Sequence, residues 1–262
     1  MTQMLDSLDD LVAAIPDGAI VALPPDYSGC AMAAVAALIE RAPRDLHLVG
    51  VPTLGLQGDM LIGAGSVSIV EAAAVGLGEL GGAPSFEAAI RAGSITMRDA
   101  TCPAIHAGLQ AAERGVGSMP VAGIVGSDLI RHRAGDWLVV PDPITAQPTV
   151  HVRAIRPDVA LFHAAMADRS GNVWIGVRRE LMTMAHAAKV ALVTVEQIVE
   201  DDLLADDRTA AGTIPSLYVH AVAVAERGAH PLGLRGEYGP DDAAIAAYLA
   251  GARRRSAQPI AA

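Results

Sequence analysis

The sequence predicts an α/β protein with a mainly parallel sheet and helices on both faces. Short apolar runs typical of buried strands alternate with alanine-rich segments typical of helices along most of the chain. The composition agrees, because 52% of the 262 residues are hydrophobic and only 3% are aromatic. A core made mainly of Ala, Val, Leu, Ile and Met suits helices that pack closely on a sheet.

The first half of the chain opens with a short strand that Pro24 and Pro25 end. Ser28 is placed to cap the helix that follows, because its hydroxyl can accept a hydrogen bond from a first-turn amide. The strands expected in this half span 19–23, 46–51, 67–73 and 94–97, and the helices span 29–41, 85–92 and 103–114.

The second half continues the alternation and ends in a helix followed by three arginines. Extended segments are expected at 121–125, 136–140, 159–162, 173–175, 190–195 and 217–224, and helices at 179–188 and 240–252. We find no internal repeat or long linker, so we expect one domain over 1–262. A flexible tail is expected from about residue 253.

Charge and hydropathy exclude several classes of partner. The formal net charge is −10, whereas a protein that binds nucleic acid needs a basic face. The longest apolar run, 30–39, is far shorter than the roughly 20 residues that a membrane-spanning helix needs. The N-terminus carries acids where a secretory signal has positive charge. We therefore expect a cytoplasmic protein that binds neither nucleic acid nor membrane.

The cysteines and histidines do not form a metal-binding pattern. The eight histidines are scattered, and the two cysteines, Cys30 and Cys102, lack the spacing of a ligand pair. Packing as a small apolar side chain is the preferred interpretation for both cysteines. Cys102 has an alternative role as a nucleophile, because it begins a predicted helix and His106 lies one turn further on.

Two places along the predicted sheet are candidates for ligand contact. In open parallel sheets, ligands bind beyond the carboxyl ends of strands, and the loop 24–30 lies at such an end. Ser28 and Gly29 in this loop precede a helix N-terminus, although an ordinary strand–helix connection would have the same residues. Glu71 in the third strand lies either at the ligand-bearing edge or on the surface, because an unpaired buried carboxylate is costly. A glycine-rich turn that begins at Gly76 follows it.

The order of several segments resembles the A (α) subunit of family I coenzyme A transferases, especially the glutaconate CoA-transferase type. The likeness runs over most of the chain from about Asp17. The segments that carry it are Arg114–Leu129, Ala154–Leu161, Ala160–Ile175, the stretch from Lys189 to Asp202, and Gly228–Gly239.

This resemblance implies the CoA-transferase fold, which is similar to that of sugar-phosphate isomerases. It also implies transfer of CoA between carboxylic acids by a hetero-oligomer, with a nucleophilic glutamate supplied by a B subunit. The substrate would be a coenzyme A thioester, and no permanently bound cofactor is expected. The length of 262 residues suits the A half alone.

The resemblance also implies site residues. Family members carry a glycine pair in the first loop, whose amides help to form an oxyanion pocket, whereas this chain has Pro24 and Pro25 near that place. Some relatives carry a carboxylate near Cys102. The residues expected to contact substrate or CoA are Ser28, Gly29, Glu71, Gly76, Gly126 and Ser127.

Two other functions stay open at the level of sequence. An acyl-CoA or ring-opening hydrolase would use the same scaffold without a carboxylate acceptor. A non-catalytic module that binds CoA or another ligand would explain both the prolines in the loop and the lack of a nucleophile in this chain.

Overall fold

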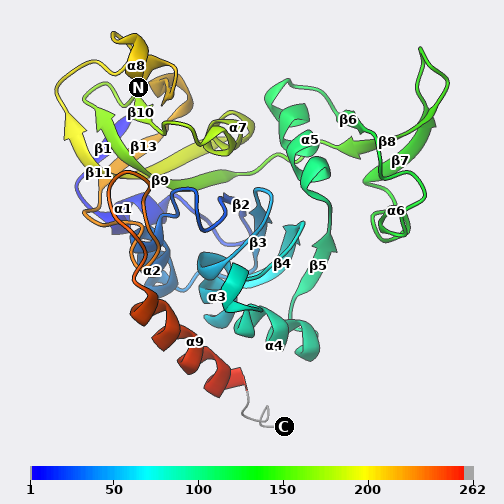
Figure 1. The fold of residues 1–262 in the computed structure, drawn as a ribbon, viewed down its shortest axis with the longest axis horizontal. Coiled ribbons are helices and arrows are strands. Elements are labelled where there is room, and N and C mark those ends of the chain that lie inside the picture. The colour runs from blue at the N-terminus through cyan, green and yellow to red at the C-terminus, as the bar shows by residue number, and fades with distance from the viewer. Residues whose placement is uncertain (1, 257–262) are drawn as a thin grey trace.

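The computed structural model describes residues 2–256, and its largest element is a ten-stranded sheet (Figure 1). Eight strands lie in the order β1-β13-β11-β9-β2-β3-β4-β5, and every neighbouring pair in this order is parallel. Their bounds are Gln3–Leu5 (β1), Ile20–Leu23 (β2), Leu46–Gly50 (β3), Val67–Ala72 (β4), Thr96–Asp99 (β5), Val159–Asp168 (β9), Val190–Val199 (β11) and Ala221–Val224 (β13). Two short strands, Val173–Trp174 (β10) and Thr213–Ile214 (β12), extend β9 in antiparallel pairing.

The direction of winding reverses between β2 and β9. From β2 the chain adds β3, β4 and β5 on one side, whereas β11 and β13 are added on the other side of β9. Such a reversal leaves a crevice at the carboxyl ends of the two central strands, because the connections on either side lead away from each other. The fold therefore places the loop after β2 where ligands bind in open α/β sheets.

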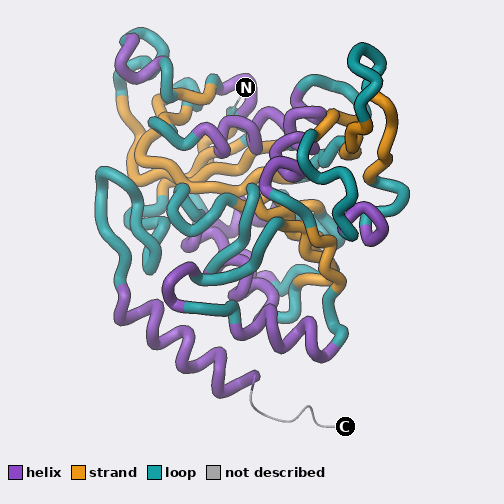
Figure 2. The backbone as a smooth tube through the Cα atoms, turned by 45° about the vertical axis from the view of Figure 1, so that its right-hand side comes forward, coloured by secondary structure: helices purple, strands orange, loops and turns teal. Residues whose placement is uncertain are grey.

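Helices cover both faces of this sheet (Figure 2). One face packs against α1, α2, α3 and α4, and the other against α5 and α7. The helices are Leu8–Ala13 (α1), Met32–Arg41 (α2), Leu56–Gly63 (α3), Pro84–Ala92 (α4), Cys102–Glu113 (α5), Leu129–His132 (α6), Arg179–Ala187 (α7), Asp207–Ala210 (α8) and Asp242–Ser256 (α9), with 3-10 turns at Gly78–Leu80 and Ser216–Tyr218.

A smaller antiparallel sheet lies beyond α5 (Figure 1). Its order is β6-β8-β7, with bounds Ser118–Val121 (β6), Trp137–Pro141 (β7) and Pro148–Arg153 (β8). Trp137, Val150 and Val152 are buried and belong to the same apolar cluster as the α5 face of the large sheet. The small sheet is thus joined to the main body by a shared core.

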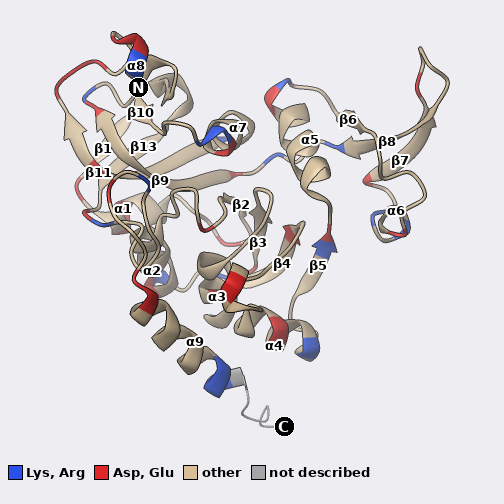
Figure 3. Ribbon diagram, in the orientation of Figure 1, with Lys and Arg blue, Asp and Glu red and all other residues tan. Residues whose placement is uncertain are grey.

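The large sheet is almost uncharged, as the tan strands of Figure 3 show. Its core is aliphatic, with Phe162 in β9 as the largest of the fully buried side chains. Because both faces of a parallel sheet are buried, its strands form continuous apolar runs. The α/β class with a mainly parallel sheet and helices on both faces is confirmed.

Several boundaries differ from the sequence prediction. Strand β9 continues six residues past the predicted end at Phe162, to Asp168. Helix α3 was not expected, because Gly58 and Gly63 lower the helix propensity of a short segment. Helix α9 extends to Ser256 and therefore includes the three arginines that were assigned to a tail. The rest of that expected tail, 257–262, lies outside the described residues.

Within residues 2–256, none of the helices combines the length and apolar character required to cross a bilayer.

Truncation of Phe162 tests the core of the central strand. Phe162→Ala leaves a void where the large sheet meets α5 and α7, so the free energy of unfolding should fall by about 3–5 kcal/mol. Urea unfolding followed by circular dichroism measures this change. Ile144→Ala is the control, because that side chain is 91% exposed and its truncation should change stability by under about 0.5 kcal/mol. Equal effects of the two substitutions would contradict the assignment of the core.

Candidate functional site

The loop from Pro24 to Cys30 leaves β2 at the point where the winding reverses. Here β9 has lost β2 as a partner, and the amide of His163 donates instead to the Gly29 carbonyl at 2.7 Å. Gly29 has a φ of +72°, and a Cβ atom at this position would lie 2.2 Å from the His163 carbonyl oxygen. Only glycine fits, so the loop is held directly against the central strand.

Ser28 does not cap the following helix, contrary to the sequence prediction. Helix α2 begins three residues later than expected, and its N-cap residue is Ala31. The fully buried Ser28 hydroxyl donates instead to Glu180 on α7. The serine is oriented by this long-range contact, which ties the loop to the helix on the opposite side of the crevice.

A cavity of about 240 Å³ opens on one side of the loop, and we call it the arginine cavity. It lies between the loop, β9, the start of α7 and the segment 234–236. Its walls are mostly apolar, with two arginines at the lining. The lining residues used below are Tyr27, Gly29, His163, Trp174, Arg178, Leu181, Leu234 and Arg235.

One wall of the arginine cavity is fixed by a buried hydrogen-bond network around His163. Its Nδ1 lies 2.8 Å from Thr194 Oγ1, and its Nε2 lies 2.7 Å from Glu196 Oε1. The same Glu196 oxygen accepts a hydrogen bond of 2.6 Å from the Tyr238 hydroxyl, and Oε2 accepts one from the Arg227 amide. Burial lowers the pKa of His163 despite the opposing effect of Glu196. His163 is therefore a hydrogen-bonded histidine with both ring nitrogens occupied.

A second cavity, of about 450 Å³, lies on the other side of Tyr27, which lines both cavities. We call it the glycine cavity. It lies beyond the carboxyl ends of β2, β3 and β4, and Gly76, one of the residues expected from the sequence, is part of its wall. Other lining residues include Asp26, Gly55, Leu77, Gly78 and Gly233.

Asp26 supplies the only carboxylate among the described residues that line these two cavities. Its oxygens lie 2.9 and 3.0 Å from the amide nitrogen of Leu56, at the start of α3. Burial raises the pKa of Asp26 to about 6, and the Leu56 amide offsets only part of the effect. Sequence reasoning missed this residue, although a carboxylate directly after a strand-ending proline pair was a usable signal.

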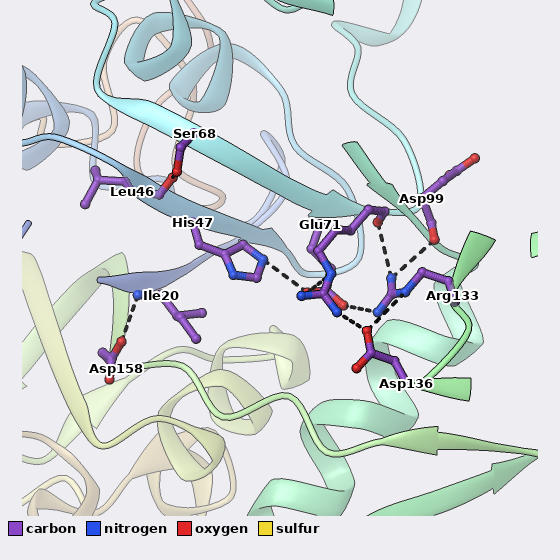
Figure 4. A network of polar contacts seen from close by, with 10 residues as sticks. Ile20, Leu46, His47, Ser68, Glu71, Asp99, Arg133, Asp136 and Asp158 are labelled. Carbon is purple, nitrogen blue, oxygen red and sulfur yellow. Dashed lines mark hydrogen bonds and ion pairs between the residues drawn. The ribbon is translucent and has the colours of Figure 1, made fainter. Parts of the chain in front are cut away.

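Glu71 lies in a buried ionic network rather than in the lining of either cavity (Figure 4). Arg133 donates to Oε1 at 2.5 Å, while His47 Nε2 lies 3.1 Å from Oε2 and Arg98 lies 3.7 Å from it. Burial alone would raise the pKa of Glu71, but the imidazole and the two guanidinium groups outweigh it and hold the pKa at about 2. The contact role expected for Glu71 stays a prediction.

Arg133 is the buried cation at the centre of this network. Only 5% of its surface is exposed, and its guanidinium also donates to the carbonyls of Arg98 and Asp99 on β5, both at 3.3 Å. It lies 5.0 Å from the ring centroid of Trp137 in the small sheet. The charged run Arg131–Arg133 favours a solvated face over a phosphate clamp when it is considered from the sequence alone, and for Arg133 that interpretation is wrong because its side chain is buried. Its charge links the small sheet to the ends of β4 and β5.

The remaining expected residues lie apart from both cavities. Gly126 and Ser127 belong to the loop before α6, where the Ser127 hydroxyl accepts a hydrogen bond of 3.3 Å from the Leu129 amide. Cys102 is the exposed first residue of α5, and its thiol forms no hydrogen bond with His106 or with any other described residue. Cys30, in contrast, is fully buried as expected. Substrate contact by Gly126 and Ser127 stays a prediction.

The crevice therefore combines the loop after β2, the buried and hydrogen-bonded His163, two arginines and two cavities. Within residues 2–256 no group of three or more His, Cys, Asp or Glu side chains is arranged to hold a metal ion. The amides of Tyr27 and Gly29 donate no hydrogen bond to any described residue, so both are available to an acceptor from outside the chain. The arrangement is suited to polarising a carbonyl and binding an anion.

Residues 5–225 match the family model described as coenzyme A transferase. The chain is 30% identical to the A subunit of 3-oxoadipate CoA-transferase from Pseudomonas knackmussii, over 92% of this chain and 86% of that protein. It is 29% identical to the cholesterol ring-cleaving hydrolase IpdA subunit of Rhodococcus jostii, over 90% and 82% respectively. An uncharacterized protein of Archaeoglobus fulgidus is 32% identical over 73% of this chain, which spans only 43% of that protein.

Two solved structures are similar over almost the whole chain. The decarboxylase AibA/AibB superposes with a TM-score of 0.86 and 29% identity, over 98% of this chain and 97% of the matched chain. Glutaconate coenzyme A-transferase of Acidaminococcus fermentans superposes with a TM-score of 0.85 and 26% identity, over 96% and 84%. The likeness therefore includes the small sheet as well as the large one.

Neutralising Glu71 should destabilise the protein by about 3–5 kcal/mol at pH 7, because Glu71→Gln leaves Arg133 buried without its counter-charge. The depressed pKa contributes stability above the unfolded value near 4.5, and this contribution is lost as the pH falls toward 2. Urea unfolding at pH 7 and pH 4 should show a smaller difference from the unsubstituted protein at pH 4. Glu87→Gln, which breaks an exposed pair with Arg91, should change stability by under about 0.5 kcal/mol.

Neutralising Asp26 should stabilise the protein, whereas neutralising Glu71 should destabilise it. The folded pKa of about 6 exceeds the ordinary value of 3.8, so the protonated folded state is favoured and stability declines as the pH rises between these values. Asp26→Asn should therefore raise the free energy of unfolding by about 1–3 kcal/mol at pH 8 and change it little below pH 4. Thermal unfolding across this pH range measures the difference. Asp17→Asn should give no gain, since the Arg44 amide lowers the pKa of that exposed carboxyl.

Proposed function

Since this chain belongs to the coenzyme A transferase family, we propose that it is the A subunit of a two-subunit enzyme that moves CoA between carboxylic acids. The family match covers residues 5–225, and the A subunit of 3-oxoadipate CoA-transferase aligns with 92% of the chain. We place the enzyme in the cytoplasm, with acyl-CoA and small carboxylic acids as its substrates and no permanently bound cofactor.

The reaction proceeds by covalent catalysis. The thioester carbonyl is attacked by a glutamate carboxylate of the B subunit, which forms an acyl–glutamyl anhydride and releases the CoA thiolate. The thiolate then attacks the glutamyl carbonyl, so that the first acid leaves and an enzyme–CoA thioester remains. The acceptor acid repeats the two steps in reverse order and departs as the new thioester. Neither oxidant nor reductant is consumed.

The observation that carries this assignment is the loop after β2, which lies between two cavities and contains no free nucleophile. Asp26 is the sole acid among the described lining residues, and its carboxylate oxygens already accept a hydrogen bond from the Leu56 amide, 2.9 and 3.0 Å away. The nearby carboxylates Glu180 and Glu196 are already bonded to Ser28 and His163. We therefore assign the attacking carboxylate to the partner subunit, in line with the likeness to A subunits of CoA transferases.

The contribution of this chain is to bind and polarise the thioester. Pro24 and Pro25 have no amide hydrogen, so the oxyanion that forms on the attacked carbonyl is assigned to the amides of Tyr27 and Gly29. Both residues line the arginine cavity, and neither amide is used inside the described chain. Ser28 holds the loop in place through the hydrogen bond that its hydroxyl donates to Glu180.

The proposal is tested by acyl-CoA exchange with the chain alone and with the product of the neighbouring reading frame co-expressed. Short dicarboxylate and 3-oxoacid CoA thioesters are offered with and without acetate or succinate. We expect activity in the mixture only, and only with an acceptor acid.

Other outcomes would contradict the transferase assignment. Loss of thioester without an acceptor would indicate a hydrolase, which the likeness to the ring-cleaving hydrolase makes a direct competitor. Release of carbon dioxide would indicate a decarboxylase, in line with the likeness to AibA/AibB. Saturable CoA binding without turnover in either preparation would indicate a binding module.

A further inference from the structure

Asp26 is a carboxylate without a cationic partner in the wall of the glycine cavity. Among the described residues it accepts a hydrogen bond only from the Leu56 amide, and it forms no ion pair. An ionised carboxylate has about four acceptor positions, so a single amide leaves most of them unused. A carboxylate in this state beside a cavity is suited to exchange a hydrogen bond or a proton with a ligand.

The first turn of α3 fixes the position of this carboxylate. Gly55 lies directly against it, and a Cβ atom on Gly55 would overlap both carboxylate oxygens. Gln57 is fully buried, and its side-chain amide donates to the Pro24 carbonyl at 2.5 Å. The backbone before Asp26 and the side chain of Asp26 are therefore both held by α3.

No other acid or base among the described residues pairs with this carboxylate. The Cys30 thiol, on the same loop, stays uncharged because burial raises its pKa, and the charge of Asp26 adds to this effect. Tyr27 is the other titratable side chain in the lining of the glycine cavity, and Arg178 and Arg235 line the arginine cavity instead. Burial raises the pKa of Asp26 to about 6, so both of its protonation states are populated near neutral pH.

The proposed function brings the sulfur of the thioester to the Asp26 side of the loop. When the loop amides hold the thioester oxygen, the acyl chain and the sulfur extend in different directions from the carbonyl carbon. The glycine cavity, of about 450 Å³, is larger than the arginine cavity, of about 240 Å³, and suits the longer CoA arm. The arginine cavity has apolar walls for acyl carbons, which include Trp174, Leu181 and Leu234.

We propose that Asp26 is an acid–base group of the reaction, which gives a proton to the CoA sulfur as it leaves and takes the proton back when the sulfur attacks again. This inference rests on the proposed function for the position of the thioester. An alkyl thiolate is the minor form at neutral pH, so protonation of the sulfur favours its departure.

The proton and electron pairs balance over the two steps. In the first step, the glutamate oxygen of the B subunit bonds to the carbonyl carbon, the C–S bond breaks with its electron pair on sulfur, and the sulfur takes the proton of Asp26. In the second step, Asp26 takes this proton back as the sulfur bonds to the glutamyl carbonyl carbon, and the first acid leaves as a carboxylate. Asp26 is then protonated again, ready for the acceptor acid.

The contact with sulfur is tested without turnover by the binding of coenzyme A and of desulfo-coenzyme A, which lacks the sulfur atom. Calorimetry of the co-expressed complex at pH 8, where Asp26 is ionised, should show coenzyme A bound roughly 3- to 10-fold more tightly, because the thiol donates to the carboxylate. The ratio should fall at pH 5. In Asp26→Asn it should lie closer to one and be the same at both pH values.

The acid–base role is tested by the pH dependence of acyl-CoA exchange. With the thioester that supports exchange, kcat/KM should fall as the pH rises above about 6, because the protonated fraction of Asp26 falls. Asp26→Asn should lower kcat/KM roughly 100-fold at pH 6 and less at pH 8, and should remove this pH dependence. If Asp26 only held the loop, the same factor would be lost at every pH, since the Asn carbonyl can still accept from the Leu56 amide.

The control variant is Asp17→Asn, because Asp17 is an exposed carboxyl whose contacts are with Arg44. It should change neither the binding ratio nor the pH profile. Asp26→Asn itself should fold, since it removes an unpaired and partly buried charge.

Three results would overturn the proposal. The first is equal binding of the two compounds at pH 8, or binding of neither. The second is a binding ratio that Asp26→Asn leaves unchanged. The third is a pH profile of Asp26→Asn that runs parallel to that of the unsubstituted complex. In contrast, a complex that lacks transferase activity but prefers the thiol through Asp26 would contradict the proposed function and support the contact with sulfur.

Discussion

The contact between Gly29 and the carbonyl of His163 is the constraint on which the whole crevice depends. It brings the loop after β2 into the place beside β9 that a longer β2 would have filled, at the point where the sheet reverses its winding. Because the approach leaves no room for a Cβ atom, only glycine lets the loop lie this close to β9. Tyr27 then separates the two cavities, and the loop amides remain open to a ligand.

Two buried polar networks lie within the apolar core, and each stabilises a different part of the structure. The network of Glu71 and Arg133 joins the small sheet to the edge of the large one, and the low pKa of Glu71 follows from the cations around it. The network of His163, Glu196 and Tyr238 holds the wall of the arginine cavity. Each network gives a buried carboxylate or imidazole polar partners at a place where burial would otherwise be costly.

How far the site was predictable varied with the kind of interaction. Residues of the loop 24–30 and Gly76 line the two cavities because they follow strands, and strand ends can be recognised from local composition; their contact with substrate stays a prediction. Ser28 was expected to cap a helix, but its partner is Glu180, 152 residues away. Arg133 was assigned to a solvated face because it lies among polar residues, whereas its partner Glu71 is on another element. Asp26, Arg178 and Arg235 were not recognised.

The sequence by itself determined the class of fold, because apolar runs and glycine and proline positions report local structure directly. It also determined the family, since the order of matched segments persists when individual contacts change. Only the tertiary structure decided which charged side chains form ion pairs. The path of the backbone brings a guanidinium and a carboxylate into contact, and their spacing in the sequence does not reveal it. For the same reason the lack of a cation beside Asp26 became visible only when the described residues around it were in place.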